Sequence, residues 1–294
     1  MSNMTLIILY CLLVAAGSFS GGMLPSLIQL THNRVQLMMS FVGGLMMGVA
    51  ILNMLPHGIV EAGSVDYVLR SVVLGMLVMF FLIRVFHVHQ HGHGDNTHGH
   101  EDTCHHRHDF DHDHQHEEDQ RERYSHPLSW VGLFVGLAIH TLIDGIALGG
   151  SVMAGTHDTA GAPLAGLAVF SAILMHKPLD ALSITTVMAG GGWDRRSQLV
   201  ANALFALMCP LGAITFLLCV QQLGAFQYTV LGCALGFSAG VFLCISLGDI
   251  LPELQFHQHD RTKLSIALLL GVLLAFAMGI IEPHHVHHAE ANGL

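Results

Sequence analysis

Charged side chains are scarce in this sequence. They make up 11% of its 294 residues, whereas 52% are hydrophobic and the mean hydropathy is +0.56. Because about 25% of the residues in a soluble domain are charged, this composition excludes an ordinary soluble protein and indicates a chain that lies in lipid. The formal net charge of −10 argues against a nucleic-acid partner, since such partners require basic patches.

Cysteine is too sparse and too scattered for a disulfide framework. Five of the six cysteines fall inside apolar runs, where a free thiol behaves as a small hydrophobe. Cys104 lies in a polar segment that the distribution of basic residues, described below, assigns to the cytosol, where thiols stay reduced. The sequence therefore gives no sign of a disulfide-stapled secreted fold.

Long apolar runs dominate what is present. Crossing a hydrocarbon core of about 30 Å takes about 20 helical residues, and the runs lack the alternation of a barrel strand. We therefore expect an all-α membrane protein with eight transmembrane helices. The eight runs are residues 4–30, 37–55, 67–86, 130–153, 164–189, 199–220, 228–251 and 264–281.

The few basic residues predict the orientation of these helices. Nine of the eleven Lys and Arg residues lie at the very end of the third run or in the segments that follow the first, third, fifth and seventh runs. Positive residues mark cytosolic loops, so we expect both termini to lie outside and the segment 87–129 to face the cytosol. The sequence thus predicts a multi-pass protein of the cell membrane, with the lipid bilayer as its surroundings.

The segment 87–129 separates two membrane parts, 1–86 and 130–282. It contains 13 of the 24 histidines, interleaved with Asp, Glu and Gly, and has no apolar face. We therefore expect a disordered loop that binds metal loosely, with a plain solvated linker as the alternative. A tail at 283–294 carries four more histidines, which fit either metal capture or a simple polar end.

Two HxxxD pairs in mid-membrane carry the strongest chemical signal. The fourth run contains His140 and Asp144, and the fifth contains His176 and Asp180. Positions i and i+4 share one face of a helix, and ionisable groups inside a bilayer mark functional pathways. Two imidazoles and two carboxylates predict a site for zinc, or for iron, cobalt, manganese or cadmium.

Other polar residues of the membrane runs are weaker candidates. Lys177 lies beside His176 and, at that depth, either has an anionic partner or is neutral. Asp249 and Glu253 share a face of the seventh run and fit either a metal exit station or a helix end in water. Met46 and Asn53 share a face of the second run, although Met usually serves in packing.

The second and seventh runs also contain a faint repeat. Residues 40–57 read SFVGGLMMGVAILNMLPH, and residues 236–253 read GFSAGVFLCISLGDILPE. The expected orientations of the two runs are opposite, which predicts an inverted repeat with the substrate site near the midplane.

The sequence resembles the ZIP (Zrt- and Irt-like) metal transporters. The matching segments are GGLMMGVAILNMLP, VGLAIHTLIDGIALGGS, AILMHKPLDALSI, NALFALMCPLG and FSAGVFLCISLGDILPEL. The resemblance implies a 3+2+3 arrangement of helices with inverted repeats, a homodimer, and elevator-like movement of the transport helices. It implies metal binding by the two HxxxD pairs between the fourth and fifth helices, with Met46 as a contact from the second.

The same resemblance extends to Asn202, which falls where the sixth helix of the family lines the site. Two positions depart from the family pattern. Lys177 stands where many members have a Glu that helps to hold a second metal, and Asn53 stands where many have His. The chain is thus similar to the HK branch of the family, and we expect one main metal ion.

Taken together, these features predict an importer of zinc or a related divalent metal that is not an enzyme. One alternative is a zinc exporter of the cation diffusion facilitator type, although those proteins have six spans and a folded cytosolic C-terminal domain. The other is a membrane-embedded zinc hydrolase, which would need a water-activating group apart from the ligands.

Overall fold

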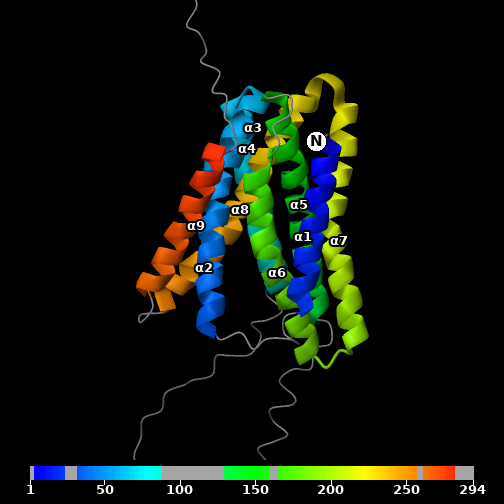
Figure 1. Ribbon diagram of the computed structural model, residues 1–294, viewed down its shortest axis with the longest axis vertical. Coiled ribbons are helices and arrows are strands. Elements are labelled where there is room, and N and C mark those ends of the chain that lie inside the picture. Colours follow the sequence, from blue (N-terminus) through cyan, green and yellow to red (C-terminus); the bar gives the residue numbers. More distant parts are fainter. Residues whose placement is uncertain (1–2, 24–31, 88–128, 159–163, 257–260, 282–294) are drawn as a thin grey trace, which may run out of the picture.

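The described part of the chain is helical throughout. The computed structural model describes residues 3–23, 32–87, 129–158, 164–256 and 261–281, and no strand occurs among them. Most of the helices run side by side along the long axis of the molecule (Figure 1). In chain order, the described helices are α1 (Asn3–Met23), α2 (His32–Val49), the π-helix η2 (Ala50–Met54), α3 (Leu55–Ala62), α4 (Val65–His87), α5 (Ser129–Asp158), α6 (Leu167–Gly190), α7 (Arg195–Val220), the 3-10 helix η4 (Gln221–Phe226), α8 (Gln227–Phe256) and α9 (Arg261–Ile281).

Seven stretches of the described residues are long and apolar enough to cross a membrane. The longest, Arg195–Gly248, has 54 residues and holds both α7 and most of α8. A single helix of that length would span about 80 Å, far more than a bilayer core of about 30 Å. The chain turns instead at η4, where Gly224 has φ 53° and ψ −119°, so α7 and α8 are separate helices.

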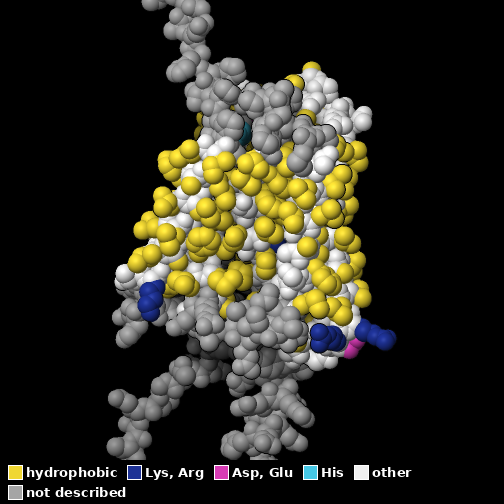
Figure 2. Space-filling view, in the orientation of Figure 1, with side chains coloured by type: hydrophobic (Ala, Val, Ile, Leu, Met, Phe, Trp, Pro, Cys, Tyr) yellow, Lys and Arg dark blue, Asp and Glu magenta, His cyan; other side chains and the backbone are white. Residues whose placement is uncertain are grey.

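The outer surface of these helices is apolar. On the face shown in Figure 2, hydrophobic side chains cover most of the height of the bundle, and most of the visible Lys and Arg lie at one end. We call this end, which holds the starts of α2 and α7 and the end of α4, the basic end. Exposed leucines and phenylalanines face outward on four helices, for example Leu12, Phe81, Leu207 and Phe276. The protein is thus an all-helical, multi-pass membrane protein, as the sequence predicted.

The second run departs most from its expected bounds of 37–55. Helix α2 begins at His32, and the chain stays helical through η2 and α3 to Ala62. Pro56 does not stop it, because it lies in the first turn of α3, where no intrahelical N–H is needed. Gly63 ends α3 with φ 62°. Of the first expected run, residues 24–30 lie outside the described residues.

Helix α2 packs closely against α9 through two glycines. A Cβ atom on Gly44 would collide with the carbonyl oxygen of Leu268 in α9. In return, a Cβ atom on Gly271 would collide with the carbonyl oxygen of Phe41 in α2. Small residues of this kind let the backbones of membrane helices approach each other.

Helices α8 and α4 repeat this arrangement. Gly240 of α8 lies against the carbonyl oxygen of Val72, and Gly75 of α4 lies against that of Phe237. Each of the four residues in the α2–α9 contact has its counterpart here at a constant distance of 196 positions along the sequence. The same offset relates the segments 40–57 and 236–253, so the faint repeat corresponds to two equivalent helix contacts.

Substitution of Gly240 tests this close packing. We expect Gly240→Ala to lower the thermal unfolding midpoint in detergent, because the methyl group meets backbone atoms of α4 that cannot move aside, and overpacking costs about 1–3 kcal/mol. Gly248→Ala in the same helix is the matched control, since nothing lies within 4 Å of the added atom. Equal midpoints for the two variants would contradict the close contact.

Candidate metal centre

Helices α5 and α6 bring the two HxxxD pairs together. His140 and His176 stack with their ring centroids 5.5 Å apart and their planes at 30°. Both rings and Asp144 are buried, whereas the side chain of Asp180 is 18% exposed. One ligand atom each of His140, His176 and Asp180 lies within 4.8 Å of the others, which is the arrangement of a metal-binding group.

Four atoms converge at the middle of this group. Nε2 of His140 lies 3.5 Å from Oδ2 of Asp144 and 3.9 Å from Oδ2 of Asp180. Nε2 of His176 lies 3.3 Å and 3.8 Å from the same two oxygens. Carboxylate oxygens are acceptors, and a neutral imidazole presents one lone pair, so this cluster is suited to a cation at its centre.

The backbone of α6 fixes which nitrogen of His176 can bind a metal. Nδ1 lies 2.8 Å from the carbonyl oxygen of Ala172 and donates a hydrogen bond to it, because a carbonyl oxygen only accepts. In the neutral ring, Nε2 then carries the lone pair and faces the centre. A second hydrogen bond that orients the ring in this way is typical of metal-binding histidines.

Lys177 supplies a fixed positive charge beside the group. Its side chain is fully buried, and its Nζ contacts Oδ2 of Asp144. Nζ also lies 3.0 Å from Oδ2 of Asp180 and donates a 3.0 Å hydrogen bond to Oγ1 of Thr141. The ring of Phe205 lies 5.6 Å from Nζ, a distance at which a cation and an aromatic face attract each other. The ammonium group therefore compensates both carboxylates.

A cavity of about 520 Å³ joins the group to the basic end of the bundle. His140, His176 and Asp180 line it together with residues closer to that end, among them Val35 of α2 and Ile83 of α4. On the opposite side of the group the chain forms a buried apolar core, which includes Val49, Ala50, Leu148, Val152 and Ile173. Access to the group among the described residues is therefore from the basic end.

The other candidate residues lie in different places. Met46 is buried and lines the same cavity. Asn53 is buried in the π-helix η2, and its amide N and O have no hydrogen-bond partner among the described residues. Asn202 lies outside that cavity lining, on a second cavity, and donates a 2.8 Å hydrogen bond to the carbonyl oxygen of Phe19. Asp249 and Glu253 belong to α8, but their side chains lie outside the described part of the structure.

Sequence reasoning missed Thr141 as a partner of Lys177. The signal was present, because HTLID and HKPLD are two copies of one motif that place Thr141 and Lys177 at equivalent positions. Helices α5 and α6 pack together, so equivalent positions of the two motifs meet. The contact of Phe205 in α7 with Lys177 was not predicted either, since an aromatic residue in an apolar helix gives no sequence signal of its contact with a cation.

Comparison with known proteins identifies the family of the chain. The family model described as ZIP Zinc transporter matches residues 4–281. The chain is 31% identical over 164 residues to the zinc transporter ZIP9-B of Xenopus laevis, covering 51% of this chain and 52% of that protein. It is 27% identical over 148 residues to zinc transporter 3 of Arabidopsis thaliana, covering 47% and 41%.

The chain thus spans about half the length of the curated relatives it matches. The family model, in contrast, runs from the first described helix to the last. This protein therefore belongs to the ZIP zinc transporter family, whose members are transporters and not enzymes.

Proposed function

We propose that this protein imports zinc, or a related divalent ion such as cadmium, iron, manganese or cobalt, across the cell membrane into the cytosol. The observation that carries the proposal is the convergence of two imidazoles and two carboxylates at the closed end of a cavity. Nitrogen and oxygen ligands of this kind suit zinc. Affinity alone does not choose among divalent metals, so the proposal covers this group of ions.

In the proposed cycle, Lys177 and the metal share the two carboxylates. A buried carboxylate without a cation would cost several kcal/mol, and the ammonium group compensates the buried Asp144 and the partly exposed Asp180 while no ion is bound. An arriving metal takes Nε2 of both histidines and Oδ2 of Asp180, while Lys177 stays on Asp144. The ammonium occupies the place of a second ion, so we expect one metal per site and assign the chain to the HK branch of the family.

We further propose eight membrane crossings in a 3+2+3 arrangement with inverted repeats, with both termini outside. The division of Arg195–Gly248 into two helices supports the number of crossings. The equivalent contacts of α2 with α9 and of α8 with α4 support the repeat. The gathering of Lys and Arg at the basic end supports a cytosolic location for that end.

Import then follows from alternating access to the one site. The structure is open from the site to the basic end, which corresponds to release into the cytosol. In the outward-open state, Met46 and Asn53 of the second membrane segment would meet the incoming ion. The unpartnered amide of Asn53 lies in a π-helix, and π-helices are frequent at functional sites. We propose elevator-like movement of the helices that carry the site, within a homodimer.

Uptake of radiolabelled zinc by cells that express the protein tests this proposal. An importer raises the accumulation of zinc above that of cells with the empty vector. An exporter of the cation diffusion facilitator type would lower it, and a membrane-embedded hydrolase would leave it unchanged. The same measurement with competing cadmium, iron, manganese or cobalt ranks the ions that the site accepts.

Deletion of residues 87–126 tests the proposed buffering role of the His-rich segment. This segment lies outside the described residues except for His87 at the end of α4. We expect the deletion variant to retain transport, because the HxxxD residues remain. Its metal content should fall by more than one ion per chain, since 13 histidines are lost. Metal content of the purified protein measures this. Loss of transport in a variant that inserts normally would contradict a buffering role.

A further inference from the structure

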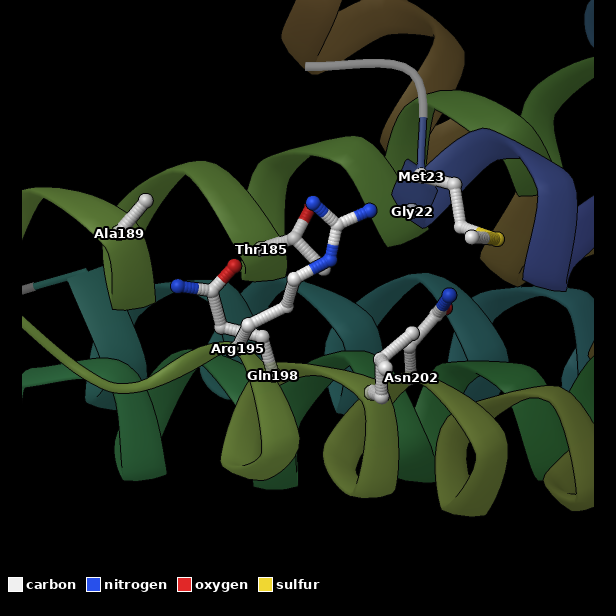
Figure 3. A pocket seen from close by; sticks show the side chains of 8 residues that line it. Gly22, Met23, Thr185, Ala189, Arg195, Gln198 and Asn202 are labelled. Carbon is white, nitrogen blue, oxygen red and sulfur yellow. The ribbon is translucent and has the colours of Figure 1, made fainter. Parts of the chain in front are cut away.

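A second cavity lies at the basic end, away from the metal centre. It has a volume of about 300 Å³ and lies between the end of α1, the last part of α6 and the start of α7. Figure 3 shows the side chains that line it, with Arg195 reaching from α7 towards Thr185 of α6. Gln198 and Asn202 line it from α7, and Met23 lines it from α1.

The positive charge in this cavity belongs to Arg195. Among the described residues no carboxylate pairs with Arg195. Its neighbour Asp194 caps α7 instead, and accepts hydrogen bonds from Oγ of Ser197 at 2.6 Å and from two backbone N–H groups. The side-chain hydrogen bond from Ser197, helped by those backbone donors, holds the pKa of Asp194 below its usual range. Arg195 is therefore available to an anion.

The same cavity presents oxygen acceptors, and one of them, in the described part of the chain, is buried without a donor. Asn202 is buried, and its Oδ1 has no hydrogen-bond partner among the described residues. Gln198 donates through Nε2 to the carbonyl of Trp193 at 2.8 Å, which leaves its amide oxygen as an acceptor. The hydroxyl of Thr185 donates to its own helix and likewise keeps its lone pairs. A buried acceptor left without a donor is costly, so a ligand that donates there is favoured.

The guanidinium group and the neutral oxygen acceptors together do not suit a metal ion. They suit a ligand that has an anionic group and a hydrogen-bond donor. A guanidinium group repels a cation, and the oxygens beside it are neutral. The guanidinium fork matches the oxygens of a phosphate. The acceptors require an O–H or N–H group on the same molecule. A phosphate ester that also carries a hydroxyl or ammonium group satisfies both ends.

The position of the cavity relative to the membrane interface indicates the source of such a ligand. Trp193 packs edge-on against Trp130, with ring centroids 5.1 Å apart, at the level where α5 and α7 begin. Tryptophan gathers at the membrane interface, and the cavity begins only two residues further on, at Arg195. Basic pockets between membrane helices on the cytosolic side bind lipid head groups.

We propose that this cavity binds the phosphodiester head group of a phospholipid whose head group carries a hydroxyl or ammonium donor, such as phosphatidylglycerol or phosphatidylethanolamine. The phosphate pairs with Arg195, and the donor bonds to Oδ1 of Asn202. The bound lipid ties the end of α1 to α7 and to α6, which itself carries His176 and Asp180 of the metal centre.

Native mass spectrometry of the purified full chain, delipidated in neutral detergent and titrated with lipid, tests the proposal. Phosphatidylethanolamine and phosphatidylcholine share a phosphate and a net charge, but only the first has N–H donors. We expect wild-type protein to bind phosphatidylethanolamine several-fold more tightly than phosphatidylcholine, and Asn202→Leu to abolish that preference. Equal binding of the two lipids to wild-type protein would overturn the assignment to Asn202.

A matched pair of variants tests the contact of Arg195 with the lipid phosphate. We expect Arg195→Gln to weaken phosphatidylglycerol binding by about tenfold, the loss of one charge-assisted hydrogen-bonded pair. Arg196→Gln removes the same charge one residue away, outside the cavity lining, and should change binding by less than about twofold. Equal losses would show non-specific attraction to the basic end and overturn the site.

A soluble probe distinguishes the source of the phosphate. sn-Glycerol 3-phosphate offers the phosphate and hydroxyls without acyl chains. We expect it to compete with phosphatidylglycerol only at far higher concentration, because it gains nothing from the bilayer. Competition at equal concentration would assign the cavity to a soluble phosphate ester and contradict a lipid site. These measurements involve no zinc, so they succeed or fail independently of the proposed transport.

Discussion

Replacement of His176 by alanine is expected to remove most zinc transport while the helix bundle stays folded. The change deletes one of two imidazole nitrogens that face the centre of the site. Loss of a partner that merely orients a metal ligand costs about 10–100-fold, so loss of a ligand itself should reduce uptake by at least about tenfold. Initial rates of radiolabelled zinc uptake measure this, and His140→Ala should behave alike.

Two controls separate ligand loss from misfolding. The expressed variant should elute as a single species in detergent, since the apolar spans are untouched. His176→Cys restores a zinc ligand of a different kind and should recover part of the transport, whereas His176→Phe fills the space and should not. Near-normal uptake by His176→Ala would remove this residue from the site.

The exchange of Lys177 for glutamate should change the number of metal ions at the centre from one to two. The ammonium group contacts the carboxylates of Asp144 and Asp180. A carboxylate in its place adds a negative charge and removes the positive one, leaving three carboxylates around the same point. Such a cluster is stable inside a membrane only with additional cations, and the second ion provides the charge.

This count is best made in protein that lacks residues 87–126, so that the His-rich segment contributes no metal. We expect one zinc ion per chain with Lys177, and two after Lys177→Glu. Lys177→Met is the matched control of similar size, without charge, and should still bind only one. A count of one in both variants would show that Lys177 merely pairs with a structural carboxylate. Two ions in the parent protein would contradict the proposed role directly.

Helix positions and the metal-binding group were largely predictable from the sequence. An apolar run of about 20 residues in a bilayer is expected to form a helix, because a helix satisfies each backbone polar group within the segment itself. The pairing of His140 with His176 followed from two copies of one motif. Only their meeting at the closed end of a cavity required the structure.

Contacts between segments far apart in the sequence were not predictable in the same way. The hydrogen bond from Asn202 to the carbonyl of Phe19 joins residues 183 positions apart, and no local pattern signals it. The resemblance alone assigns Asn202 to the metal site, and in this structure Asn202 lines the second cavity. The π-helix around Asn53 was not predictable either, since the sequence of Ala50–Met54 is typical of an ordinary apolar α-helix.

Anomalous diffraction at the zinc edge from crystals grown with zinc tests the central claim most directly. We expect a single peak between α5 and α6, at about 2.0–2.2 Å from Nε2 of His140, Nε2 of His176 and an oxygen of Asp180. Two peaks bridged between the same helices, or a single peak that none of these atoms reaches, would contradict it.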